Sequence, residues 1–184
     1  GSVDIPPSEV WATLTGGEVS REAWRVIVLE TRIPSACTAA IASAALSVAG
    51  LLLQTTFDNP LAGPSILGVS TGSSLGVAIV MLAIGGAGSL AGQSAVLAGA
   101  LAGAMLIMVI LVTMSSLVRS ATMLLIVGIL IGYLSSSAIS LLNFFATQEG
   151  VHSYVIWGLG NFYGVSTERL PAFAAIAVAL LAAS

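Results

Sequence analysis

The distribution of charge along the chain constrains its fold more than any other feature. Between Arg32 and Glu149 the sequence carries only two charged side chains, Asp58 and Arg119. Overall, 57% of residues are hydrophobic and 7% are charged, and the mean hydropathy is +1.06, whereas a soluble domain is about 25% charged. This composition excludes a soluble domain, a disordered region and a nucleic-acid-binding protein, which would need a basic patch. The sequence therefore predicts an integral membrane protein.

The isolated charges divide the chain into expected membrane spans. Residues 1–32, which hold eight of the charges, are expected to be an extramembrane segment, and residues 33–184 a partial transmembrane domain. Continuous apolar runs favour helices over a barrel, so the expected fold is all-α, a polytopic transmembrane helical bundle. Pro34 is expected in the first turn of the first helix. Because a span needs about 20 apolar residues, we expect spans at about 33–57, 59–85, 91–117 and 121–146, and a truncated one at 170–184.

The counts of reactive residues exclude most chemistry. There is no lysine, one histidine (His152) and one cysteine (Cys37), so a phosphate-binding loop, a Schiff base and a Cys/His zinc site are all excluded. We expect no catalytic residue, metal or cofactor. The string Gly68-x-Ser70-x-Gly72 matches a hydrolase nucleophile motif. However, His152 is expected about 30 Å away, across the bilayer, so an intramembrane hydrolase is rejected.

Small residues recur every four positions in three of the expected spans. They are Gly68, Gly72 and Gly76, then Gly99 and Gly103, then Gly128, Gly132, Ser136 and Ser140. The spacing favours close helix packing, since small residues let backbones approach in lipid. The alternative is that the last stripe, extended by Ser135, Ser137 and Asn143, faces a wet pathway, because polar residues in spans usually face a cavity or a partner helix.

The segment Asp58–Pro64 interrupts the apolar sequence with two prolines and a glycine. One interpretation is a turn between two spans. A structured turn that re-enters the membrane is equally consistent with the pattern. The second interpretation leaves open an alternative function, an ion channel or a secondary carrier whose re-entrant turn at 58–64 forms a filter.

A set of motifs over residues 24–170 carries a family resemblance. Arg32-Ile-Pro34 is followed by Ala49-Gly50 and Gln54, and then by Asn59-Pro60-Leu61-Ala62-x-Pro64-x-x-Leu67-Gly68-Val69-Ser70-x-Gly72. Leu124-Leu125-x-x-Gly128 and Trp157-x-x-Gly160 come later. Together they resemble the FecCD-type permease of ABC importers for iron-siderophores, haem and cobalamin. The resemblance covers only about the first half of such a permease, which has ten spans.

The resemblance implies a transport subunit with a partial type II importer fold rather than an enzyme. It implies a multi-pass protein of the bacterial inner membrane, surrounded by lipid, that works by alternating access. The implied partners are ABC ATPase subunits that hydrolyse ATP, a second permease copy, and a periplasmic or lipid-anchored substrate-binding protein. Which ligand is imported does not follow from the sequence.

The resemblance also assigns roles to residues. Residues 4–32 and 147–169 would face the binding protein, although Arg21, Arg25, Arg32 and Arg169 outnumber Arg119 and would by count alone place that side in the cytoplasm. Arg32 matches the first of two docking arginines, while Ser35 occupies the position of the second. The implied translocation path follows Gly128, Gly132, Ser136, Ser140 and Asn143, and the implied cytoplasmic gate is Ser120, Ala121 and Thr122. The ATPase-coupling loop would lie beyond Ser184.

Overall fold

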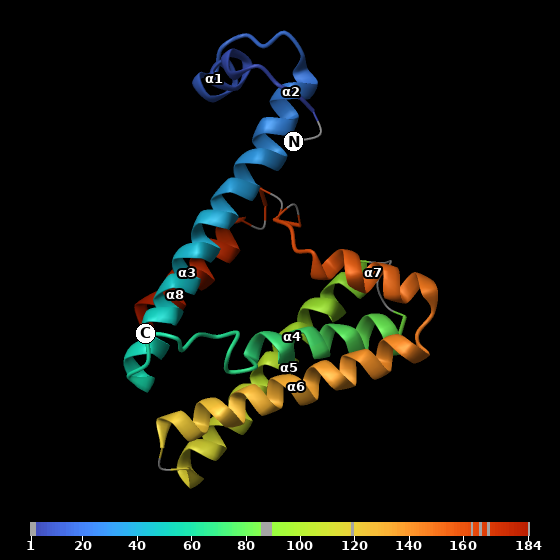
Figure 1. Cartoon of the computed structure of the whole chain (residues 1–184). Helices are drawn as coiled ribbons and strands as arrows, with labels where there is room; N and C mark the ends of the chain where they lie inside the picture. Colours follow the sequence, from blue (N-terminus) through green and yellow to red (C-terminus); the bar gives the residue numbers. More distant parts are fainter. Residues whose placement is uncertain are drawn as a thin grey trace. The chain divides into compact units, whose positions relative to one another are not determined.

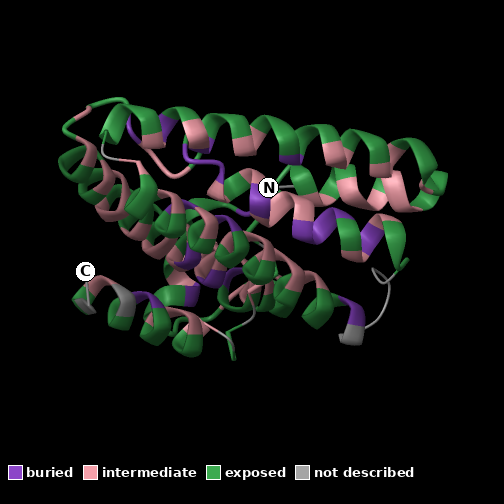
Figure 2. Ribbon diagram, turned by 90° about the horizontal axis from the view of Figure 1, so that it is seen from below, coloured by how far each residue is buried: buried purple, intermediate pink, exposed green. Residues whose placement is uncertain are grey.

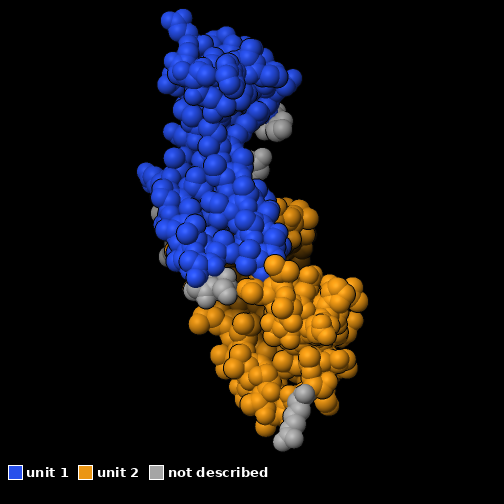
Figure 3. Space-filling view, turned by 90° about the vertical axis from the view of Figure 1, so that its left-hand side faces the viewer, with its two compact units in different colours: residues 1–48, 161–184 blue, residues 49–160 orange. Residues whose placement is uncertain are grey.

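The chain consists of helices joined by turns, which confirms the predicted all-α fold. A computed structural model describes residues 3–85, 90–118, 120–162, 164–165, 167–168 and 170–183, and these contain no strand. Arg119 and Arg169, which entered the expected orientation, lie outside the described residues. The chain divides into two compact units, residues 1–48 with 161–184 and residues 49–160 (Figure 3).

The first unit is built on the start of a long continuous helix. Helix α1 (Pro7–Thr15) ends at Gly16, whose φ of 75° gives the left-handed conformation that often closes a helix. Helix α2 (Glu22–Val26), the π-helical η1 (Ile27–Arg32) and α3 (Ile33–Phe57) then follow without a break, as Figure 1 shows. Together they form a 36-residue helix, Glu22–Phe57. The expectation that Pro34 lies in the first turn of its helix is therefore wrong, because the helix extends eleven residues before Ile33 towards the N-terminus.

Pro34 explains why part of this helix is π-helical. It lies inside the long helix rather than in its first turn, and a proline in a helix interior removes one hydrogen bond and clashes with the preceding turn. Just before it, the Ile33 N–H bonds to the Val28 carbonyl, five residues back. This wider turn makes room for the proline ring, whose side chain is fully buried.

The C-terminal part of the first unit contains helix α8 (Leu170–Ala183). Two side-chain hydrogen bonds hold the segment before α8 to the long helix. Ser35 Oγ donates to the Phe162 carbonyl at 3.3 Å, and Thr167 Oγ1 donates to the Leu29 carbonyl at 3.4 Å.

The second unit contains the packed helices. These are α4 (Val69–Ala78), continued by the π-helical η2 (Ile79–Ala83), then α5 (Leu90–Leu117), α6 (Ala121–Phe145) and α7 (Gln148–Gly158). In the described part of the chain, three helices are long and apolar enough to cross a membrane, Glu22–Phe57, Gly92–Leu117 and Ala121–Phe145. Within the expected span 59–85 the helix covers only Val69–Ala83, because residues 58–68 form turns.

The core of the second unit lies where α5 and α6 meet the turn before α4. Its buried residues are Ala62, Leu67, Ile107, Leu111 and Leu125. Figure 2 shows that exposed residues cover most of the remaining helix surface. Large apolar side chains such as Leu134, 72% exposed, stand on that surface, as expected for helices surrounded by lipid or by other helices.

Candidate functional site

The motif segment begins with a well-formed helix end at Asp58. The Asn59 N–H bonds to the Gln54 carbonyl at 3.0 Å and the Asp58 N–H to the Thr55 carbonyl at 3.3 Å. This pair of bonds is the Schellman arrangement, which needs a left-handed residue after the helix. Asp58 takes that position with a φ of 45°, and aspartate is one of the few residues besides glycine that tolerates it.

Asn59 then folds the chain back on itself. Its Oδ1 accepts a hydrogen bond from the Leu61 N–H at 2.9 Å, and its carbonyl accepts one from the Ala62 N–H at 3.0 Å. Pro60 between them supplies the fixed φ that such a turn favours. Ala62 is buried in the core, while Leu61 is 75% exposed. Residues 58–64 are thus a hydrogen-bonded turn between α3 and α4, and none of them is helical.

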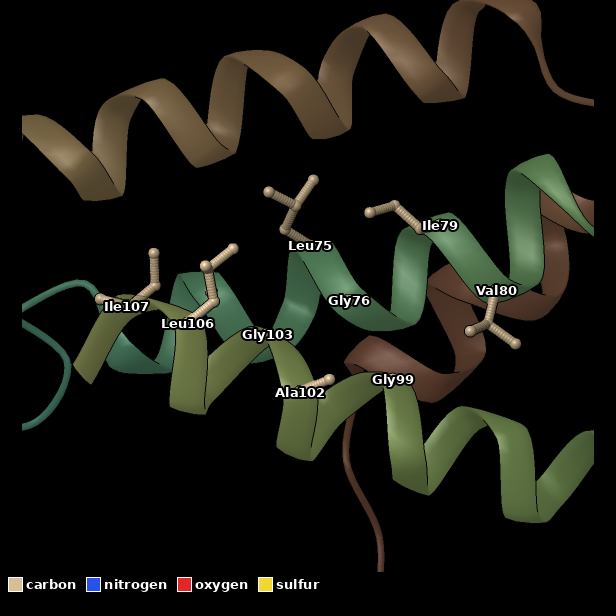
Figure 4. Close-up of a pocket in the computed structure, with 10 residues that line it drawn as sticks. Leu75, Gly76, Ile79, Val80, Gly99, Ala102, Gly103, Leu106 and Ile107 are labelled. Carbon is tan, nitrogen blue, oxygen red and sulfur yellow. The ribbon is translucent and has the colours of Figure 1, made fainter. Parts of the chain in front are cut away.

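The glycine runs bring α4 and α5 into backbone contact. A Cβ placed on Gly76 would lie 1.9 Å from the Gly99 carbonyl oxygen, and one on Gly103 would lie 2.1 Å from the Gly72 carbonyl oxygen. Only residues without a side chain fit at these positions. Gly76, Gly99 and Gly103 lie where the two helices meet in Figure 4, beside an apolar cavity of ≈ 260 Å³. The packing interpretation of these glycines therefore holds in the structure.

A second glycine contact joins α4 to α6. Gly68 precedes α4 with a φ of 77°, and a Cβ there would lie 2.8 Å from the Gly128 carbonyl oxygen. A Cβ on Gly128 would lie 2.9 Å from Leu67 Cα. Gly132 continues this contact, with Thr71 Oγ1 at 3.3 Å from its virtual Cβ. Gly68 and Gly128 thus hold the start of α4 against α6.

The structure divides the expected stripe on α6 into two parts. Positions four apart drift by about 40° around a helix with 3.6 residues per turn, so the stripe leaves the α4 contact after Gly132. Ser136 and Ser140 are both exposed, and Ser140 Oγ donates to the Ser136 carbonyl at 3.0 Å. Ser135 is only 4% exposed and lies on the packed face, not on an open one.

The two ends of α6 carry the remaining path and gate residues. Ser120 is the N-cap residue without a side-chain capping bond, and it is exposed, as are Ala121 and Thr122. Near the other end, Asn143 Nδ2 donates to the Ile139 carbonyl at 3.1 Å, while its Oδ1 is buried without a hydrogen-bond partner among the described residues. A buried amide oxygen of this kind is costly unless a further group satisfies it.

The other predicted site residues lie apart from α6. Arg32 donates from its guanidinium to the Val3 carbonyl, a contact that the sequence did not indicate. Gln54 is exposed near the end of α3, where its carbonyl accepts the bond from Asn59. Ser70 is exposed in the first turn of α4, and Pro64 is half-buried in the turn before it.

Helix α7 packs across the end of α4 through contacts that the sequence did not predict. Its N-cap Thr147 accepts a hydrogen bond from the Gly150 N–H, and the Tyr154 hydroxyl donates to the Ser74 carbonyl at 3.5 Å. Burial raises the pKa of Tyr154, and its ring stacks on Trp157 with centroids 6.2 Å apart. His152 is exposed on this helix.

Comparison with known proteins places this arrangement in a family. The model of the FecCD transport family matches residues 1–184. The vitamin B12 import system permease protein BtuC of Vibrio cholerae is 33% identical over 167 residues, which are 90% of this chain and 47% of that protein. BtuC of Salmonella paratyphi A is 34% identical over 145 residues, 78% of this chain and 43% of that protein.

A solved structure shares the fold as well. It is described as an inward-facing conformation of a metal-chelate type ABC transporter, and it matches with a TM-score of 0.69 and 28% identity over 83% of this chain and 47% of that one. The chain thus spans about half the length of the relatives it matches. The apolar helices and these relatives agree with a multi-pass protein of the bacterial inner membrane. The chain belongs to the FecCD transport family.

Proposed function

We propose that this chain forms part of the permease subunit of an ABC importer that carries cobalamin or another metal chelate, such as an iron-siderophore or haem, across the inner membrane. The observation that carries the proposal is the family match along the whole chain. The names of its relatives, a vitamin B12 import permease and a metal-chelate transporter, support this ligand class. The permease works as a dimer with ATPase subunits and a substrate-binding protein. ATP binding and hydrolysis on the ATPase subunits reorient its helices.

Uptake by the assembled complex tests this function directly. Proteoliposomes that hold the permease containing this chain, its ATPase and its binding protein are expected to accumulate labelled cobalamin or ferric siderophore only when ATP is supplied. Uptake of the same ligand by the permease without the ATPase would contradict the proposal and favour a channel or a secondary carrier.

The path for the ligand runs along the exposed serine face of α6. Ser136 and Ser140 place hydroxyl groups on the surface of an otherwise apolar helix, and polar groups within a span usually face water or a partner rather than lipid. Gly128 and Gly132 lie on another side of α6, where they pack against the start of α4. Asn143 lies near one end of the path, and Ser120, Ala121 and Thr122 form the cytoplasmic gate at the other.

Thiol labelling tests the path. Leu134 provides a matched control, because it is also exposed but lies about 160° around the helix from Ser136. In a cysteine-free complex, Ser136→Cys is expected to react with a charged, water-soluble thiol reagent in at least one nucleotide state, while Leu134→Cys stays protected in all of them. Equal reactivity of the two cysteines, or protection of Ser136→Cys in every state, would remove these serines from the path.

A further inference from the structure

Tyr133 lies at the midpoint of α6, with twelve helical residues on each side of it, 121–132 and 134–145. Its side chain is 69% exposed, and its hydroxyl makes no hydrogen bond within the described part of the chain. At 1.5 Å per residue, it lies about 18 Å from either end of the helix. Tyrosine in membrane spans is usually found near the ends, where its hydroxyl reaches water. Because lipid tails offer no hydrogen-bonding partner, a hydroxyl at the centre of a span indicates water, another segment of protein or a ligand beside it.

Tyr133 shares a face of α6 with the serines of the proposed path. At about 100° per residue, Ser137 and Ser140 lie about 40° and 20° from Tyr133 around the helix, and Ser136 lies about 60° away. All three serines are exposed. Ser137 Oγ donates to the Tyr133 carbonyl and Ser140 Oγ to the Ser136 carbonyl, each at 3.0 Å. The hydroxyl hydrogens of Ser137 and Ser140 are therefore in use, whereas the hydroxyls of Tyr133 and Ser136 remain available as donors.

The same face is apolar in the half of α6 nearer its N-terminus. Ile126, Ile129 and Leu130 all lie within about 60° of Tyr133 around the helix, and all three are exposed. The half nearer the C-terminus carries the serine hydroxyls instead. Tyr133 therefore lies at the border between the two halves, and its side chain combines an apolar ring with a polar hydroxyl.

This combination suits a metal chelate with an apolar surface and oxygen acceptors at its edge, such as carboxylate or amide groups. Sites for organic ligands of this kind combine apolar and aromatic side chains with a few placed polar groups. A tyrosine ring covers an apolar surface at little entropic cost, because the side chain has few rotatable bonds. Its hydroxyl donates a hydrogen bond to an acceptor that would otherwise be left unpaired at the centre of the span.

We propose that Tyr133 is a ligand-contact residue at the centre of the path. Its hydroxyl donates a hydrogen bond to an oxygen at the edge of the passing chelate, and its ring contacts the apolar surface of the chelate. This inference rests on the proposed function, because it names a contact within the proposed path and the chemical class of ligand that fits it. The spacing of small residues did not indicate Tyr133, because its side chain is large.

Thiol labelling tests whether Tyr133 faces the path. In the cysteine-free complex that contains the ATPase, Tyr133→Cys is expected to react with a charged, water-soluble thiol reagent in at least one nucleotide state. Leu134→Cys, which is also exposed but lies about 100° around the helix, is expected to stay protected in all of them. Protection of Tyr133→Cys in every state, as for a side chain covered by lipid or by a packed helix, would overturn the inference even if Ser136→Cys reacts.

ATP-driven uptake into proteoliposomes tests the contact itself. The probe is whichever of labelled cobalamin, haem and ferric siderophore the unmodified complex accumulates. Tyr133→Phe removes only the hydroxyl and is expected to slow uptake by about two- to tenfold, the effect of one hydrogen bond, because an acceptor of the ligand then stays unpaired. Tyr133→Ala, which also removes the ring, is expected to slow uptake further. Leu134→Ala is the matched control and is expected to transport at the unmodified rate.

ATPase activity stimulated by the loaded binding protein shows whether each variant assembles. Tyr133→Phe changes the volume of the side chain little, so it decides the outcome if Tyr133→Ala fails to assemble. Uptake by an assembled Tyr133→Phe complex at the unmodified rate would overturn the inference. Absence of ATP-dependent uptake of every probe by the unmodified complex would instead contradict the proposed function.

Discussion

Replacing Gly76 with alanine tests the glycine contact between α4 and α5. The new Cβ would lie 1.9 Å from the Gly99 carbonyl oxygen, whereas ordinary contacts begin at 3.4 Å. The helices must therefore separate by about 1.5 Å at this point, and overpacking of this kind costs about 1–3 kcal/mol. The obstacle is backbone, so the upper part of that range applies. The better helix propensity of alanine offsets up to about 1 kcal/mol of this cost. The expected net loss is about 2 kcal/mol.

Gly50 provides the control for this experiment. It also lies within a helix, but a Cβ there meets nothing within 4 Å, so Gly50→Ala is expected to be neutral or stabilising by up to about 1 kcal/mol. The free energy of unfolding of each purified variant is measured by titrating SDS into mixed micelles and following helix content by circular dichroism. Equal stability of the two variants would refute the inferred backbone contact.

Two further predictions concern the ends of α3 and α1. Asp58→Gly is expected to stabilise the protein by up to about 1 kcal/mol, because glycine adopts the left-handed conformation without strain, while Asp58→Val destabilises it in the same SDS titration. The hydrogen bonds from Ser20 lower the pKa of the Glu9 carboxyl below its ordinary value near 4.5. They therefore stabilise the folded loop after α1 above that pH, and the stabilisation is lost as the pH falls through the lowered pKa. Proteolysis at Gly16–Gly17 is therefore expected to accelerate in acid. The Ser20→Ala variant is expected to be cleaved faster than the unmodified protein at neutral pH, and its cleavage rate is expected to change little in acid. Equal cleavage rates of the two proteins at neutral pH would contradict this role of Glu9.

The sequence predicted the helices best where charge or glycine marks their ends. The expected fourth span, 121–146, lies within a residue of α6, and α3 ends at Phe57 as the single charge at Asp58 suggested. The start of the long helix was missed because Pro34 normally indicates a first turn. A π-helical turn that accommodates a proline inside a helix depends on the packing around it, and no residue pattern identified it.

The candidate site was predictable in its residue types but not in its pairing. Spacing indicated that Gly76 and Gly103 permit close approach, yet only the fold shows that they meet Gly99 and Gly72. On α6, the four-residue spacing of small side chains predicted a single stripe that continued from Gly132 to Ser140. The helical period is 3.6 residues, however, so the later positions lie on another face of the helix. No sequence pattern predicted the hydrogen bond from Arg32 to the Val3 carbonyl, because every residue has a backbone carbonyl that could accept it.

The backbone contacts among α4, α5 and α6 have a mechanical consequence. Where carbonyl groups touch Cα atoms, there are no side-chain rotamers to absorb a shift, so sliding one helix past another soon meets hard repulsion. These three helices are therefore expected to tilt together as a block during any transport cycle. Any change in helix orientation must then occur elsewhere, at contacts formed by longer side chains that can change rotamer.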